Sequence, residues 1–235
     1  GVFVVGFSAQ AFGTNCFVVA PDKGEECLVI DPGFGVEGQL REVVDRYRLR
    51  PVGLLATHGH LDHTYSLPVL SQQVGAPVRI HGADRYRLAD PALALSADLL
   101  SMVEQQLGFG VQWVQPQDVV EVDGGQVVSL AGLEFEVVHA PGHTEGSVLF
   151  RFSGVPQGLA ADVEVDHTIF SGDVLFAGSI GRTDLPGGDG QLMQRTLREI
   201  VLAQSDSGLV LPGHGPATTI GHERLTNPYL QGLHS

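Results

Sequence analysis

Directly after a strand-like run, the chain reads Thr57-His58-Gly59-His60-Leu61-Asp62-His63, which places three imidazoles and one carboxylate within six residues. Neutral imidazole and ionised carboxylate are donors for zinc, iron and manganese. The spacing of two puts His58 and His60 on the same side of an extended loop, whereas Asp62 and His63 begin the next turn and point elsewhere. We therefore expect one loop to supply two adjacent metal positions. A polar loop that is merely rich in histidine is the alternative, and the density of ligand-type side chains argues against it.

Three further residues of ligand type follow predicted strands, namely His143, Asp173 and His214, and a glycine directly precedes each of them. Glycine lets the backbone approach a bound ion without a side chain in the way. Ligands commonly gather at strand ends in α/β architectures, so we expect these residues to join the first cluster. Taken singly, each is an ordinary turn residue or helix cap; the shared pattern favours a metal site.

Apolar runs bounded by turn residues predict strands, and one-faced apolar periodicity predicts helices. The predicted strands are Val2–Phe7, Cys16–Ala20, Cys27–Ile30, Val52–Ala56, Val78–His81, Val119–Val122, Val127–Leu130, Leu133–His139, Ser147–Phe152, Thr168–Phe170 and Leu209–Leu211. The predicted helices are Val36–Tyr47, Leu67–Val74, Ala97–Leu107 capped by Ser96, Leu192–Leu202 with Asp189 near its start, and a last turn or helix near His222–Leu225. The polar segment Gly154–Asp166 is predicted to be a flexible excursion.

Strands followed by helices occur twice along the chain, and the second strand-rich half begins at Val119. Each half must cover an apolar sheet face with helices. The predicted architecture is therefore an α+β fold, a four-layer αββα sandwich. The sequence shows no linker, and we expect a single domain spanning residues 1–235.

Composition narrows the classes of partner. The 235 residues are 43% apolar and 17% charged, and the formal net charge is −14. A surface this acidic repels phosphate backbones and anionic lipids, so we expect neither nucleic acid nor membrane partners. No segment has the roughly twenty apolar residues that a bilayer span needs. The chain shows no export signal, and we expect a cytoplasmic protein of undetermined oligomeric state.

The two cysteines and five of the histidines are assigned no chemistry. Cys16 and Cys27 lie in apolar, strand-like runs, where buried free thiols are the expectation and a disulfide is the alternative. His139 ends a strand and is predicted to pack against the site rather than bind metal. The remaining histidines either follow a strand, as His81 does, or are predicted to lie on the surface: His167, His222 and His234.

With these motifs assembled, the chain resembles the metallo-β-lactamase-fold superfamily, and within it the glyoxalase II-like (hydroxyacylglutathione hydrolase-like) thioester hydrolases. The ligand motif carries the first resemblance. The stretch SGDVLFAGSIGRTDLP, at 171–186, narrows it to the glyoxalase II-like members and their near relatives. The resemblance extends over almost the whole chain, from Thr14-Asn15-Cys16 through Asn227-Pro228-Tyr229.

The resemblance implies a centre of two divalent metal ions, with zinc as the first expectation and iron or manganese as alternatives. It assigns His58, His60 and His143 to one ion, and Asp62, His63 and His214 to the other, with Asp173 bridging both. It places Asp31 behind the metal site, where it would hold the ligands in position.

The resemblance also implies a reaction. Two ions would share a water and make hydroxide available for attack on a thioester carbonyl, while Asp62 and Asp173 orient that hydroxide. Arg182 would bind the small-molecule substrate, or it would instead form a salt bridge to Asp184. Asp184 stands where glutathione-dependent members have a tyrosine, and only about twenty residues follow His214. The thiol carrier therefore stays open between glutathione, another carrier and a smaller thioester.

Two other readings remain. A persulfide dioxygenase of the same fold would use one iron held by His58, His143 and Asp173. A non-catalytic metal-binding protein is the alternative of another class, although no ligand of the set is missing from this sequence. β-Lactam hydrolysis is disfavoured, because position 173 is aspartate rather than cysteine and no export signal is visible.

Overall fold

The first sheet begins as an antiparallel meander and continues with parallel strands. A computed structural model describes residues 1–91 and 97–233. The strand order is β1 (Phe3–Ser8), β2 (Asn15–Ala20), β3 (Glu26–Ile30), β4 (Arg50–Leu55), β5 (Val78–His81) and β6 (Val119–Val122). The strands from β3 to β6 are parallel neighbours, and helices connect β3 to β4 and β4 to β5, as parallel crossovers require.

The second sheet is mostly antiparallel. Its order is β14 (Thr218–Thr219), β13 (Gly208–Pro212), β10 (His167–Gly172), β9 (Val148–Phe152), β8 (Leu133–His139) and β7 (Val127–Leu130). Only β10 and β13 pair in parallel. A small ribbon, β11 (Leu175–Phe176) with β12 (Ser179–Ile180), follows β10 directly.

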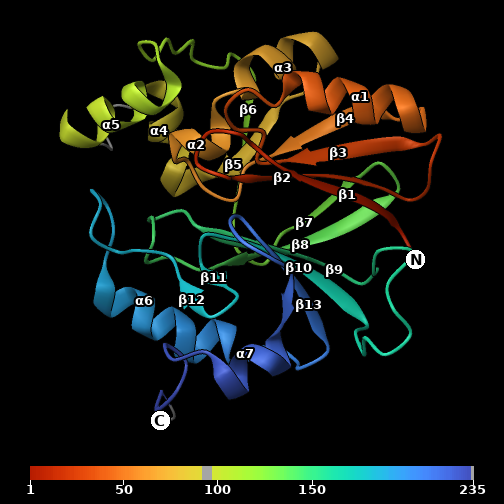
Figure 1. Cartoon of the computed structure of the whole chain (residues 1–235), viewed down its shortest axis with the longest axis vertical. Coiled ribbons are helices and arrows are strands. Elements are labelled where there is room, and N and C mark those ends of the chain that lie inside the picture. Colours follow the sequence, from red (N-terminus) through yellow and green to blue (C-terminus); the bar gives the residue numbers. More distant parts are fainter. Residues whose placement is uncertain (92–96, 234–235) are drawn as a thin grey trace.

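Helices cover the outer face of each sheet (Figure 1). Over the first sheet lie α1 (Glu37–Tyr47) and α3 (Leu67–Val74), with the short α2 (Leu61–Thr64), a 3₁₀ turn (Gly82–Asp84), α4 (Arg85–Ala89) and α5 (Ala97–Leu107) beside them. Over the second lie α6 (Gly190–Thr196), which continues as a π-helical turn (Leu197–Val201), and α7 (Ile220–Thr226). The layers are therefore helix, sheet, sheet, helix, which confirms the predicted α+β sandwich.

Successive residues of the central strands alternate between two apolar cores. In β2, Phe17 and Val19 point into the core between the sheets, whereas Cys16 and Val18 pack under the outer helices. In β10, Phe170 faces the core between the sheets, and Ile169 faces the core under α6 and α7. Because both faces of these strands are buried, their sequences read as continuous apolar runs.

Most of the predicted elements are confirmed within a residue or two, but the assignment of Val119–Val122 to the second half is wrong. This strand, β6, pairs in parallel with β5 in the first sheet. The period-two pattern identifies a strand but not its partner; here a crossover through α4 and α5 returns the chain to the edge of the same sheet. The single helix predicted at Leu192–Leu202 consists of the end of α6 followed directly by the π-helical turn. The predicted cap Ser96 and surface residue His234 lie outside the described residues.

Four smaller features concern the cysteines, the segment Gly154–Asp166, the exposure of α5 and the length of the helices. Both cysteines are buried free thiols, as expected. The segment Gly154–Asp166 contains no helix or strand, although Pro156 makes one bridge to Val2. The apolar face of α5 is only half-buried. Within the described ranges, no helix combines the length and apolar character needed to cross a bilayer.

Candidate metal centre

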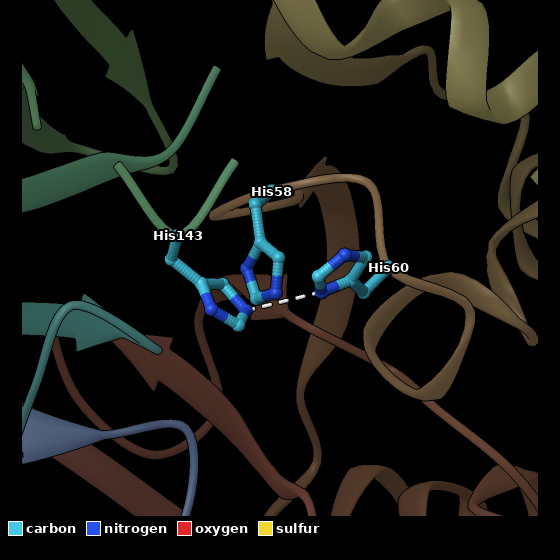
Figure 2. A group of neighbouring side chains, drawn as sticks. All are labelled: His58, His60 and His143. Carbon is cyan, nitrogen blue, oxygen red and sulfur yellow. Dashed lines mark hydrogen bonds between the residues drawn. The ribbon is translucent and has the colours of Figure 1, made fainter. Parts of the chain in front are cut away.

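Three imidazoles converge from two sheets at the first cluster. His58 and His60 follow β4, whereas His143 follows β8 of the second sheet. Figure 2 shows their rings facing one another, and Nδ1 of His60 lies 3.0 Å from Nε2 of His143. All three residues are buried, and one nitrogen of each lies within 4.8 Å of the others. The predicted meeting of His143 with the first loop is therefore present in the structure.

The hydrogen-bond partners of two of these rings set their tautomers. The Thr57 hydroxyl donates to Asp31 at 2.6 Å, so its oxygen is free to accept from Nδ1–H of His58 at 3.0 Å. Nδ1–H of His143 donates to the carbonyl of Arg182 at 2.7 Å. Each ring is therefore left with a bare Nε2 lone pair directed at the centre, which is the form that ligates a metal ion.

The first cluster has unsatisfied donor atoms that fit a divalent cation. Nε2 of His58 and Nε2 of His60 are buried without a hydrogen-bond partner in the described part of the chain. Burial and the neighbouring imidazoles keep the pKa of His58 well below its usual value and lower the pKa of His60 to about 3. Buried neutral imidazoles with orphaned nitrogens are costly unless something binds them, and a metal ion satisfies that need.

A second cluster adjoins the first and combines two carboxylates with two imidazoles. Nε2 of His63 lies 3.1 Å from Oδ2 of Asp173, and Nδ1 of His214 lies 3.0 Å from its Oδ1. Oδ2 of Asp62 lies 3.3 Å from Nε2 of His214 and 3.5 Å from Nε2 of His63. The four residues come from α2 and from the ends of β10 and β13.

Asp173 lies between the two clusters. Its Oδ2 is 3.1 Å from His63 in the second cluster, and 3.5 Å and 3.8 Å from Nε2 of His143 and His58 in the first. One carboxylate therefore reaches both groups, which is the position that the sequence prediction gives it.

The second cluster attracts positive charge. Burial opposes protonation of His214, but hydrogen bonds to Asp173 and Asp62 outweigh it and raise the pKa to about 9. The same balance, with Asp173 as the main attracting charge, raises the pKa of His63 well above its usual value. Burial would raise the pKa of Asp173, but the charge of His63 and hydrogen bonds from three imidazoles hold it well below its usual value. Ionised carboxylates at this density suit a divalent cation.

Asp31 stands behind both clusters, as predicted. It is 2% exposed and has a positive φ of 56°. Its carboxylate accepts from the backbone N–H of Thr57 at 2.8 Å and from Nδ1 of His63 at 2.8 Å, in addition to the Thr57 hydroxyl. The bond to His63 leaves the Nε2 of that ring facing the cluster.

Two residues that contact the ligands or the loops carrying them have no recognisable sequence signal. The Thr14 hydroxyl, from the loop between β1 and β2, donates to Oδ2 of Asp62 at 2.9 Å and lies 3.2 Å from Nε2 of His214. The fully buried Asp84 connects the two ligand loops: it accepts from the N–H of Gly59 at 2.8 Å, the N–H of Gly146 at 2.7 Å and the hydroxyl of Thr144 at 2.7 Å.

Arg87 supports this connection from the other side. Its guanidinium is fully buried, lies 3.4 Å from Oδ1 of Asp84 and donates to Glu145 at 2.5 Å and to the carbonyl of Pro186 at 3.1 Å. Both Asp84 and Arg87 belong to short helical turns after β5, and an isolated aspartate or arginine in such a turn reads as an ordinary surface residue. Their role depends on contacts with distant backbone groups.

Arg182 is held by Asp184 through bonds of 2.6 Å and 2.8 Å, and both side chains are exposed. The salt bridge that the sequence offered as the alternative is therefore present, and substrate binding by Arg182 stays a prediction. Its backbone carbonyl already serves the site through His143.

The remaining histidines lie outside both clusters. His139 stacks on the buried His81 with ring centroids 4.1 Å apart, and its Nε2 donates to the carbonyl of Glu145 at 2.8 Å. His139 thus packs against the loop that carries His143. His222 is exposed, as predicted, whereas His167, at the start of β10, is half-buried and its Nδ1 lies 2.5 Å from Oδ1 of Asp166.

Comparison with known proteins places this geometry in a family. The model of the metallo-beta-lactamase superfamily matches residues 9–214. An uncharacterized protein of Mycobacterium tuberculosis is 41% identical over 99% of both chains. The hydroxyacylglutathione hydrolase GloC of Haemophilus influenzae is 32% identical over 94% of both chains. The crystal structure of the B3 metallo-beta-lactamase BLEG-1 superposes with a TM-score of 0.80 at 31% identity, covering 98% of this chain and all of that one. The chain therefore belongs to the metallo-beta-lactamase superfamily.

Proposed function

We propose that this protein is a metal-dependent hydrolase that holds two divalent ions and cleaves a small-molecule thioester of the hydroxyacyl type. The observation that carries the proposal is the position of Asp173, whose carboxylate reaches both ligand clusters. His58, His60 and His143 would hold one ion; Asp62, His63 and His214 would hold the other. Zinc suits this donor set best, and iron or manganese would also be accepted.

Divalent ions held by these residues would supply an activated water and would polarise a carbonyl oxygen. The residues of the chain prepare the site for that chemistry. Thr14 and His214 fix one oxygen of Asp62, and three imidazoles keep Asp173 ionised. Both carboxylates can therefore accept a hydrogen bond from an attacking water and orient it. Asp62 is 23% exposed at its side chain, which gives water access to the second cluster.

A covalent route through cysteine finds no support. Burial raises the pKa of the Cys27 thiol to about 12 and that of Cys16 well above its usual value. A nucleophilic cysteine needs the opposite shift, together with access to solvent. Direct attack by water at the metal centre is therefore the favoured route.

The relatives guide the choice of substrate. GloC is named for hydroxyacylglutathione hydrolysis, which supports a hydroxyacyl thioester as the first compound to test. BLEG-1 is described as a B3 metallo-beta-lactamase, so a β-lactam is the natural second candidate. A one-iron persulfide dioxygenase would need only His58, His143 and Asp173; the complete second cluster favours the hydrolase with two ions.

The test is a substrate panel assayed with and without chelator. We expect zinc-loaded protein to hydrolyse lactoyl thioesters, a chelator to abolish turnover and added metal to restore it. His60→Ala and Asp173→Ala should each reduce kcat/KM by at least about a thousandfold. Leu225→Ala, which changes an exposed side chain on α7, is the matched control and should keep full activity.

Each of the other possible results of the substrate panel would indicate a different function. Faster turnover of a chromogenic cephalosporin than of any thioester would replace thioesterase with β-lactamase. Oxygen uptake with a persulfide and one iron per chain would establish the dioxygenase. Metal binding without turnover of any compound would favour a non-catalytic metal-binding protein.

A further inference from the structure

A cavity of about 280 Å³ is lined by segments that continue from the second ligand cluster, since Tyr65 follows His63 by two residues. Its walls come from the loop between β1 and β2, the segment after β3, the end of α2 and the end of α5. Apolar side chains supply most of the lining: Ala11, Phe34, Tyr65, Leu107 and Phe109. The ring centroids of Phe34 and Tyr65 lie 4.5 Å apart, and Phe12 extends this aromatic row at 5.6 Å from Phe34.

Three walls of the cavity belong to segments that carry or contact residues of the second cluster. Tyr65 caps α2, the helix that carries Asp62 and His63, and its N–H donates to the carbonyl of Leu61. Ala11 lies in the loop whose Thr14 hydroxyl binds Asp62. Before Phe34, the backbone at Gly33 packs so closely on the Asp62 carbonyl that an added Cβ would lie 2.0 Å from that oxygen. The cavity and the second cluster therefore share these backbone segments.

The fourth wall is the end of α5, a helix set apart from α1 and α3 (Figure 1). Gln106 and Leu107 line the cavity from its last turn, and Phe109 follows the left-handed Gly108. Phe109 is 54% exposed, so its ring is accessible to a ligand that enters the cavity. Trp113 anchors the returning chain by donating to the carbonyl of Leu88 at 2.7 Å.

Charge distinguishes this cavity from the rest of the surface. The whole chain carries a formal net charge of −14, yet none of the described residues that line the cavity is charged. Its polar groups are the amides of Gln10 and Gln106 and the Tyr65 hydroxyl. The cations nearest the ligand loops are already paired, Arg182 with Asp184 and Arg87 with Glu145. An anionic group would meet no free cation in this lining.

We infer that this cavity binds an uncharged, apolar portion of the substrate, so that the preferred thioesters carry an aliphatic or aromatic acyl group. The inference rests on the proposed function for the identity of the ligand. Aromatic walls next to a polar centre are the usual composition of a small-molecule site: apolar area supplies affinity, and the polar groups fix orientation. The rings of Phe34 and Tyr65 would contact the acyl chain, while the thioester carbonyl would lie at the metal centre.

The experiment lengthens the acyl group on a constant neutral thiol, N-acetylcysteamine. We expect kcat/KM to rise about threefold for each methylene from acetyl to hexanoyl, as expected when apolar surface leaves water. Phe109→Ala should lower kcat/KM for hexanoyl about tenfold and leave acetyl unchanged, whereas Phe109→Leu should restore most of the loss. Leu225→Ala, the same kind of truncation at a site on α7, should leave the whole series unchanged.

Binding of a neutral probe separates this inference from the proposed function. Saturation-transfer NMR should detect hexanamide but not acetamide on wild-type protein, and Phe109→Ala should abolish the signal. If no thioester is hydrolysed but hexanamide binds in this manner, the cavity assignment stands and the thioesterase proposal fails. An acyl series with no length dependence, or hexanamide binding that Phe109→Ala does not weaken, would overturn the cavity assignment.

Discussion

A single hydroxyl group illustrates how the centre is built at the scale of the residue. Thr57 donates to Asp31 and accepts from His58, so the tautomer of the ligand is set by a carboxylate that does not touch it. The ligands themselves could be predicted, because imidazoles and carboxylates at short spacing after a strand have few other uses. Thr14 and Asp84 could not, because a threonine or aspartate acquires its role only through contacts between loops that are far apart in sequence.

The contacts of Asp84 lead to a prediction about metal affinity. Asp84→Asn keeps the shape of the side chain but replaces one of its acceptor oxygens by a donor, so N–H and O–H groups of both ligand loops lose an acceptor. We expect metal affinity to fall about 10-fold to 100-fold, as for other residues that hold ligands in place, while the circular dichroism spectrum is retained. Isothermal titration of the metal-free protein with zinc measures the change.

Asp184→Asn is the matched control, since Asp184 is an exposed aspartate that forms a salt bridge with Arg182. It should bind zinc as tightly as wild type. Equal zinc affinity of Asp84→Asn and wild-type protein would show that Asp84 does not help to hold the metal ligands in place.

At the scale of the element, one arrangement recurs: a strand ends in a glycine or is followed by one, and a predicted metal ligand comes directly after that glycine. It occurs after β8, β10 and β13, and at Gly213 the backbone passes so close to Asp173 and His63 that glycine is needed. This pattern is visible in the sequence because it is local. The pairing of β6 with β5 is not local, and the sequence therefore placed that strand in the wrong half of the fold.

A substitution at Gly213 tests whether the close approach of the backbone to the ligands is required. A Cβ at this position would lie 2.4 Å from Oδ1 of Asp173 and 2.7 Å from Cε1 of His63, so the second cluster would have to open. We expect Gly213→Ala to lower kcat/KM at least about a hundredfold and to lose the more weakly held ion, as measured by steady-state kinetics and elemental analysis.

Gly38→Ala controls for the added methyl group. A Cβ at Gly38 meets nothing within 4 Å, and the residue lies inside α1. That variant should gain about 0.5–1 kcal/mol in unfolding free energy and keep wild-type activity. Full activity in Gly213→Ala would show that close backbone approach is not required.

At the scale of the whole molecule, the centre exists only because two sheets pack against each other. The first sheet carries the loop with His58, His60, Asp62 and His63, whereas the second carries His143, Asp173 and His214. The order of strands followed by helices, which occurs twice along the chain, predicted the four layers, because each sheet must cover an apolar face with helices. It could not predict the register of one sheet on the other, and that register determines where Asp173 lies between the clusters.

The number of metal ions bound per chain shows whether Asp173 serves two metal positions. Elemental analysis of protein saturated with zinc should give two ions per chain for wild type and for Leu225→Ala. His143→Ala should retain one ion, because only the first cluster loses a ligand, and Asp173→Ala should bind both ions more weakly. One ion per chain in saturated wild-type protein, or two tightly bound ions in Asp173→Ala, would contradict the account.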